Sequence, residues 1–266
     1  MYKSILLFPI ILLTACFDNV TQNKDQVASL VFSTDSHKVV AIQSDFHILA
    51  QRLQCMNTQG ETRTVGEYCA SLRLISQKTN VEWLNQFLDD LALSILTETK
   101  SSKQGIEQLV QNWFNDVLPE LESSRSWDYS REIHFIGQRG RMATFSVITS
   151  YYTGGANGLY DTQFLNIDLN DRVIYRLEDL LIAPDKLPML TQLLCDKNMA
   201  RLHNLSALPQ HINSDEFEAI DNFVFTINGL TFRYPVYSLG SYAEGEIDLV
   251  LPYSQLRDII KPEFLH

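Results

Sequence analysis

A change of hydrophobic periodicity near residue 120 limits the folds that this 266-residue chain can adopt. Before it, apolar residues recur at helical spacing over 81–95 and 106–117, with short alternating runs over 38–76. After it, alternation typical of half-buried strands dominates, apart from a helical stretch over 185–202. Because strands and helices come in runs without a βαβ rhythm, we expect an α+β fold, with a mostly antiparallel sheet packed against several amphipathic helices.

The N-terminus predicts export and lipidation. Lys3 precedes an apolar run over 5–13, and small residues then lead to Cys16 as in a lipoprotein cleavage box. The run is shorter than the ~20 residues that a transmembrane helix needs. We therefore expect a lipoprotein signal peptide over 1–15, lipid on Cys16 and a flexible tether over 16–35.

The remaining chain is long enough for a sizeable core. We expect an N-terminal strand-helix-helix part over 36–125 and a C-terminal domain over 126–266. The predicted location is outside the cytoplasm, on a bacterial membrane and facing the periplasm.

The charge balance restricts the partners. The chain has 32 acidic and 21 basic residues, a net charge of −11, and loss of Lys3 with the signal leaves 20 basic residues and −12. Such a chain is repelled by nucleic acid and by anionic lipid, and attracts a basic partner.

Three cysteines remain besides the predicted anchor. Cys55 and Cys69 can form a disulfide that closes a 15-residue loop in an oxidising compartment. Cys195 lies on an apolar helical pattern, which predicts a buried thiol. No CxxC or HxxxH spacing is present, so we expect no metal and no cofactor.

The stretch TSYYTGGANGLYDTQF, residues 149–164, places three of only 11 glycines within five residues. Neither phosphate-loop spacing is present, which argues against nucleotide binding. Two explanations remain open. The glycines either form a tight corner between strands, with positive φ, or keep a loop bare so that a partner or a sugar ring can approach between tyrosines.

A second candidate segment lies near the C-terminus. Glu244, Glu246 and Asp248 alternate, so on one strand they would form an acidic face, with Tyr234, Tyr237 and Tyr242 nearby as anchors. Paired carboxylates can hydrolyse glycosides, which leaves a hydrolase as a third hypothesis. Because no GxSxG, HExxH or SxxK motif occurs, we expect a binding protein and no enzyme.

The pair Asn228-Gly229 lies between two alternating apolar runs and predicts a type I′ hairpin turn.

The motifs over about 145–258 resemble the extracellular domain of RsiV-type lysozyme-sensing anti-sigma factors and the accessory domains of PdaC-type peptidoglycan deacetylases. The matching positions are Thr153, Gly154, Gly155, Ala156, Asn157 and Gly158, then Asp168, Tyr242, Gly245, Pro252 and Tyr253. The resemblance implies binding of a basic muramidase such as lysozyme, or of cell-wall glycan. Asn157 departs from the family's histidine, and the family's membrane span and sigma-binding segment are missing from the match.

Together these observations predict a cell-envelope lipoprotein that binds a basic cell-wall hydrolase, as its inhibitor or sensor. The alternative is a module that binds peptidoglycan or another glycan. The predicted binding residues are Tyr151, Tyr152, Thr153, Gly154, Gly155, Asn157, Gly158, Tyr160, Tyr237, Tyr242, Glu244 and Glu246.

Overall fold

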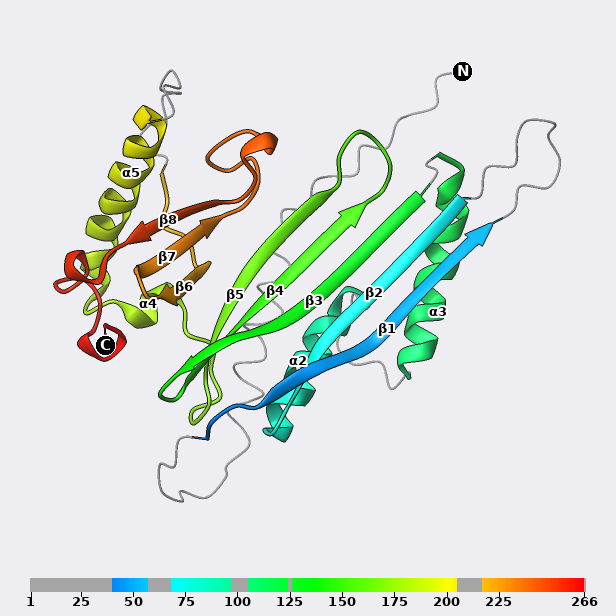
Figure 1. Ribbon diagram of the computed structural model, residues 1–266, viewed down its shortest axis with the longest axis horizontal. Helices are drawn as coiled ribbons and strands as arrows, with labels where there is room; N and C mark the ends of the chain where they lie inside the picture. The colour runs from blue at the N-terminus through cyan, green and yellow to red at the C-terminus, as the bar shows by residue number, and fades with distance from the viewer. Residues whose placement is uncertain (1–39, 57–67, 97–104, 124–125, 205–216, 266) are drawn as a thin grey trace.

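The computed structural model describes residues 40–56, 68–96, 105–123, 126–204 and 217–265, and it has two sheets, each covered by helices on one face (Figure 1). The mixture of helices and mostly antiparallel strands confirms the α+β prediction. The predicted signal peptide, Cys16 and the tether lie outside the described residues. None of the described helices is long and apolar enough to cross a membrane.

The first sheet has five strands in the order of the chain. They are β1 Ser44–Met56, β2 Tyr68–Thr79, β3 Ser126–Arg139, β4 Met142–Tyr152 and β5 Leu159–Asp168. All neighbours are antiparallel except β2 and β3, which are parallel because α2 (Glu82–Leu93) and α3 (Ile106–Val117) form the crossover between them. The domain boundary expected at residue 125 therefore falls inside this sheet.

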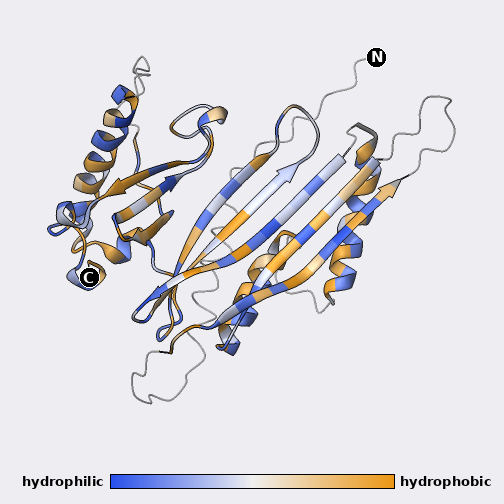
Figure 2. Ribbon diagram, in the orientation of Figure 1, coloured by the Kyte–Doolittle hydropathy of each residue, from blue (hydrophilic) through white to orange (hydrophobic). Residues whose placement is uncertain are grey.

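Helices α2 and α3 cover one face of the five-stranded sheet. Leu84 and Leu88 of α2 pack against Phe145, while Phe114 of α3 packs against Leu72. Figure 2 shows the matching alternation of apolar and polar residues along the strands. The other face of the sheet is free of α2 and α3, so most of its side chains are polar or exposed.

Asn80 is of a residue type that often caps helices, but it does not cap α2. Val81 occupies the N-cap position, and the Asn80 side chain instead joins the backbone of Ala41 and Gln43. Helix α3 begins at Ile106, and Gly105 occupies its N-cap position.

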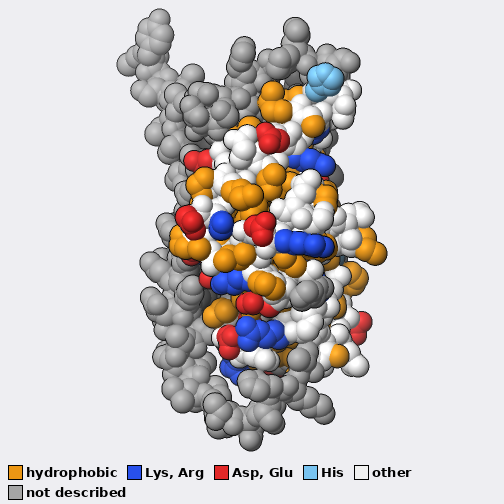
Figure 3. Space-filling view, turned by 90° about the vertical axis from the view of Figure 1, so that its left-hand side faces the viewer, with side chains coloured by type: hydrophobic (Ala, Val, Ile, Leu, Met, Phe, Trp, Pro, Cys, Tyr) orange, Lys and Arg blue, Asp and Glu red, His pale blue; other side chains and the backbone are white. Residues whose placement is uncertain are grey.

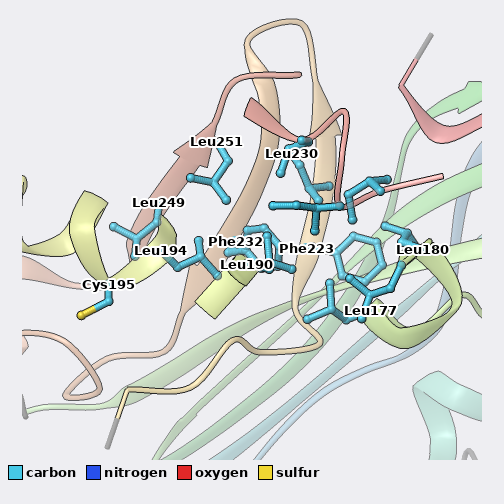
Figure 4. Close-up of a cluster of buried hydrophobic side chains, with 14 of the residues drawn as sticks. Leu177, Leu180, Leu190, Leu194, Cys195, Phe223, Leu230, Phe232, Leu249 and Leu251 are labelled. Atoms are coloured by element: carbon cyan, nitrogen blue, oxygen red, sulfur yellow. The ribbon is translucent and has the colours of Figure 1, made fainter. Parts of the chain in front are cut away.

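The second sheet and its helices form a smaller unit. Its strands and helices are α4 Leu177–Leu180, α5 Leu187–Asn204, β6 Phe223–Thr226, β7 Gly229–Tyr234 and β8 Ile247–Leu251. Figure 4 shows Leu190 and Leu194 of α5 among the phenylalanines of β6 and β7. Cys195 is a buried free thiol of this core, as predicted, and burial raises its pKa.

Short 3-10 helices occur in both units. They are η1 Ser94–Leu96, η2 Leu118–Ser123, η3 Pro184–Lys186, η5 Tyr242–Glu244, η6 Tyr253–Gln255 and η7 Pro262–Phe264.

The β6–β7 hairpin differs from the predicted turn. Its central residues are Ile227 and Asn228, and neither has positive φ, so the turn is not type I′. Gly229 instead begins β7 with φ 144°, and a Cβ there would lie 2.1 Å from the carbonyl oxygen of Leu251. The glycine is needed for close packing against β8.

Side chains of the smaller unit form hydrogen bonds with backbone N–H and carbonyl groups on the unpaired edge of β5. The Asn222 amide accepts a hydrogen bond from the Phe164 N–H (2.8 Å) and donates to the Thr162 carbonyl (2.7 Å). Glu246 accepts from the Thr162 N–H at 2.5 Å. At the other end of the junction, the Arg139 guanidinium lies over the ring of Phe225. The edge strand is therefore joined to the second unit through side chains and without a shared strand.

The predicted disulfide is present and joins Cys55 to Cys69, which are paired residues of β1 and β2. We expect the Cys55→Ser/Cys69→Ser variant to lose ~3 kcal/mol of unfolding free energy, because the open loop gains entropy in the unfolded chain. Urea unfolding of both proteins, with and without reductant, measures this. A reductant that destabilises the variant as much as the wild type would contradict the prediction.

Removal of the Asn222 amide should weaken the junction. Asn222→Ala leaves an N–H and a carbonyl of β5 without partners, so we expect a loss of ~2–5 kcal/mol in unfolding free energy. Hydrogen exchange at the Phe164 amide should quicken in parallel. Asn228→Ala, at the exposed turn, is the matched control and should change stability by less than ~0.5 kcal/mol.

Candidate functional site

The glycine loop over 153–158 connects β4 to β5. Gly154 and Gly155 have φ of 96° and 100°, which glycine adopts without strain. A Cβ on Gly158 would lie 3.2 Å from the Tyr151 carbonyl oxygen. Two of the glycines are thus explained by a tight corner and the third by close backbone packing, while a contact role for the loop stays a prediction. Asn157 is exposed and has no positive φ, so turn geometry does not account for it.

The structure brings the glycine loop and the 237–246 segment into contact, and both lie along the upper side of the view in Figure 1. The Tyr242 hydroxyl donates to the Gly158 carbonyl at 2.8 Å. The Tyr160 hydroxyl lies so near Gly245, which has φ 69°, that a Cβ there would be 2.6 Å from it. We call the area formed by Gly154–Gly158, Tyr160, Tyr237 and Tyr242 the tyrosine–glycine surface.

Tyr237 is the most unusual residue of this surface. It has φ 70°, which is rare for a bulky residue, and 61% of the residue is exposed. Its ring lies 5.7 Å from that of Tyr242, centroid to centroid, so the two rings support one another. Strained backbone conformations cluster at active sites and ligand contacts, which makes Tyr237 a candidate contact residue.

The predicted acidic face is wrong. Glu244 lies in η5 and not on β8, which begins at Ile247, so the three acids do not share one strand face. Only 10% of the Glu246 side chain is exposed, because it binds the edge of β5. Tyr234 is also not an anchor, since it is buried and its hydroxyl donates to the Glu218 carbonyl.

Two arginines neutralise these acids. Arg201 of α5 contacts Glu244 at 2.8 Å, and Arg233 of β7 contacts Asp248 at 2.7 Å and Glu246 at 3.8 Å. Figure 3 shows the same mixing on the face that carries α5, where basic side chains lie beside acidic ones. The net negative charge of the chain is therefore not concentrated at this segment.

A cavity of about 300 Å³ lies beside the first residues of the glycine loop, between α3 and the adjacent ends of β3 and β4. Its lining is largely aromatic. The lining residues are Trp113, Val117, Trp127, Asp128, Tyr129, Tyr151, Tyr152 and Thr153. We call it the aromatic cavity.

The predicted site residues divide between these two features. Tyr151, Tyr152 and Thr153 border the aromatic cavity, whereas Gly158 and Tyr160 contact the 237–246 segment. Trp113 belongs to the apolar helical stripe over 106–117, and neither it nor Trp127 is among the predicted binding residues. The alternation of Trp127 and Tyr129, which places both on one face of β3, was the available signal.

Two acids two residues apart should affect stability with opposite pH dependence. Burial raises the pKa of Glu246 above its usual 4.5, so the stability it confers is full below pH 4.5 and is lost as pH rises through its folded pKa. Hydrogen bonds from the Ser241 backbone and from Arg201 lower the pKa of Glu244, so its contribution is present above pH 4.5 and is lost as pH falls.

Unfolding free energies of the wild type, Glu246→Gln and Glu244→Gln, measured from about pH 3 to pH 8, test this. Relative to Glu246→Gln, the wild type should become less stable as pH rises. Relative to Glu244→Gln, it should become more stable. Parallel curves for the two variants would contradict the assignment.

Comparison with known proteins agrees with this architecture. Residues 180–254, which include the second sheet, match the family described as "Protein of unknown function (DUF3298)". No curated protein matches the chain.

Two solved DUF3298 family proteins are similar in fold. The protein from Bacteroides fragilis is 20% identical, with TM-score 0.62, and the alignment covers 83% of this chain and 94% of that one. The protein from Pseudomonas aeruginosa is 18% identical, with TM-score 0.63, covering 85% and 97%. The chain thus contains a segment that matches DUF3298 and shares a fold with members of that family across both sheets.

Proposed function

We propose that this chain is a cell-envelope lipoprotein with an RsiV-like domain, which binds a basic cell-wall hydrolase such as lysozyme through the tyrosine–glycine surface. The observation that carries the proposal is the junction of two segments about 84 positions apart, joined by the Tyr242–Gly158 hydrogen bond. These are the segments through which the chain resembles the lysozyme-sensing family.

The compartment is consistent with such a partner. The Cys55–Cys69 disulfide is typical of proteins outside the cytoplasm, in an extracellular or periplasmic location. Attachment through lipid on Cys16 is part of the proposal, and it would hold the domain at the membrane while the tether lets it reach the cell wall.

Aromatic contacts supply most of the affinity in this proposal. Exposed tyrosines are common anchors at protein interfaces, because they offer large contact area with few rotatable bonds. The strained backbone at Tyr237 and the Tyr237–Tyr242 ring contact hold the rings in place before binding, which reduces the entropy lost on association.

Charge has a smaller, long-range role. The chain's net charge of −11 accelerates encounter with a basic protein. Glu244 and Glu246 are already paired with arginines, so we expect no strong direct pairing of these acids with the partner. The same pairing, with the burial of Glu246, does not favour a hydrolase, and we propose a binding role without catalysis.

Titration calorimetry of the mature domain with a lysozyme-type muramidase tests the proposal. Tyr237→Ala should weaken binding by about 10-fold or more, because an exposed anchor is lost. Raising salt from low to physiological concentration should weaken binding, because it screens the attraction between the acidic chain and its basic partner.

Phe46→Ala is the matched control. Phe46 is an exposed aromatic residue on β1, the edge strand on the opposite side of the five-stranded sheet from β5. It should bind as the wild type does. Absence of binding to basic muramidases at low salt, or equal losses for both variants, would refute the proposal.

A further inference from the structure

We infer that the end of the molecule formed by the β6–β7 turn and the start of the described chain rests on the membrane surface, with Ile227 inserted among the lipid headgroups. This inference rests on the lipid anchor of the proposed function, and it adds which end of the domain faces the bilayer. The partner is a lipid surface that is contacted through an apolar side chain and does not need to be anionic. The tyrosine–glycine surface then points away from the membrane.

Ile227 is the most exposed of the large hydrophobic residues that the structure describes. It occupies one of the two central positions of the β6–β7 turn, and 96% of the residue is exposed. The Thr226 hydroxyl holds the turn, because it donates to the Gly229 carbonyl at 3.0 Å and accepts from the Asn228 N–H at 3.3 Å. An apolar side chain presented in this way is stabilised when it leaves water for the interfacial region of a bilayer.

The described chain begins beside the same turn. The Gln138 amide, near the end of β3, donates to the Val40 carbonyl at 2.8 Å. The next residue of β3, Arg139, donates to the Tyr253 hydroxyl at 3.2 Å, and that hydroxyl donates to the Thr226 carbonyl at 2.7 Å. Two consecutive residues of one strand thus reach both the start of the described chain and the β6–β7 turn, so these features lie at one end of the molecule.

The length of chain before Val40 limits how far this end can lie from the lipid. Only 23 residues, 17–39, separate Cys16 from Val40. A flexible chain of this length has a root-mean-square end-to-end distance of ~25–30 Å. With lipid on Cys16, the end that carries Val40 therefore stays close to the bilayer. The effective concentration of lipid at Ile227 is then high enough for a contact that would be weak on its own.

The same contact orients the tyrosine–glycine surface. Strand β4 runs from the β3–β4 turn to the glycine loop, and its 11 residues span ~35 Å. Strand β7 runs in the corresponding sense, from Gly229 beside its turn toward the segment that holds Tyr237. Figure 1 shows the glycine loop and the 237–246 segment along the upper side of the view and the β3–β4 turn at the lower side. With Ile227 at the membrane, the tyrosine–glycine surface faces the cell wall.

Charge and area decide between the possible occupants of this end. The chain's net charge of −11 repels anionic lipid, so the apolar side chain has to supply the attraction. A second copy of the chain, meeting the first through the same turn, is the competing occupant. Stable protein interfaces bury at least ~1,200 Å² in total, which a turn with two central residues does not offer. These observations favour the lipid surface.

The test uses the full mature chain in phosphatidylcholine vesicles that contain a lipid with a nitroxide quencher at headgroup level. A fluorescent amino acid replaces Asn228, which leaves Ile227 intact, or replaces Asn157 of the glycine loop in the matched control. Both positions are exposed. We expect at least ~3-fold stronger quenching at 228 than at 157, because only the turn reaches the headgroups. With Ile227→Asp, which should fold because Ile227 is exposed, quenching at 228 should fall to the level at 157.

Anchoring is measured separately, by flotation of the chain with the vesicles. If cells add no lipid to Cys16, that part of the proposed function fails, and a vesicle lipid is coupled to the Cys16 thiol so that quenching can still be measured. The free thiol of Cys195 is buried and should not react. Three results would overturn the inference: equal quenching at 228 and 157, quenching that Ile227→Asp leaves unchanged, or quenching that appears only with anionic vesicles. A fluorescence change at 228 that grows with protein concentration without vesicles would instead identify a second copy as the occupant.

Discussion

The arrangement of the two sheets depends on which groups form hydrogen bonds with the backbone on the outer edge of β5. A strand at the edge of a sheet has backbone groups without partners, and water or another strand normally supplies them. Here one side chain, the Asn222 amide, binds both the N–H of Phe164 and the carbonyl of Thr162, as a neighbouring strand would. Asn222 also donates to the Arg233 carbonyl at 2.9 Å, so it joins the two sheets directly.

This junction fixes the position of the tyrosine–glycine surface. Glu246 binds the N–H of Thr162, and the preceding Gly245 therefore lies against Tyr160. Arg233 lies over the Phe164 ring and contacts both Glu246 and Asp248, which orients β7 and β8 relative to β5. Two acids of the cluster that the sequence suggests, Glu246 and Asp248, are thus paired within the fold by the edge of β5 and by Arg233.

Local patterns in the sequence were sufficient for the elements of the fold. The helical spacing of Leu84 and Leu88 and the alternation along β4 reflect burial on one face, which is a local property. The Cys55–Cys69 pair could be predicted from spacing and compartment. The parallel pairing of β2 with β3 could not, because it depends on how a crossover of two helices returns the chain to the sheet.

The site was predictable only in part, for a similar reason. The contact between the glycine loop and the 237–246 segment was expected. The pairing of Glu244 was not, because its partner Arg201 lies on α5 and no local sequence pattern connects the two residues. The aromatic cavity depended on Trp113 and Trp127, which meet only because α3 packs across the ends of β3 and β4. Long-range packing of this kind has no local signal in one sequence.

Asp168 illustrates how a motif residue can be structural. It belongs to the motif shared with the lysozyme-sensing family, yet its side chain is fully buried. Its carboxylate accepts hydrogen bonds from the Asn170 and Asp171 amides and from the Tyr175 hydroxyl, and it contacts Arg141 at 2.9 Å. A buried carboxylate needs such partners to remain stable, and these hold the turn that follows β5. Motif residues that stay exposed, such as Asn157 and Tyr160, are therefore better candidates for ligand contact than the buried ones.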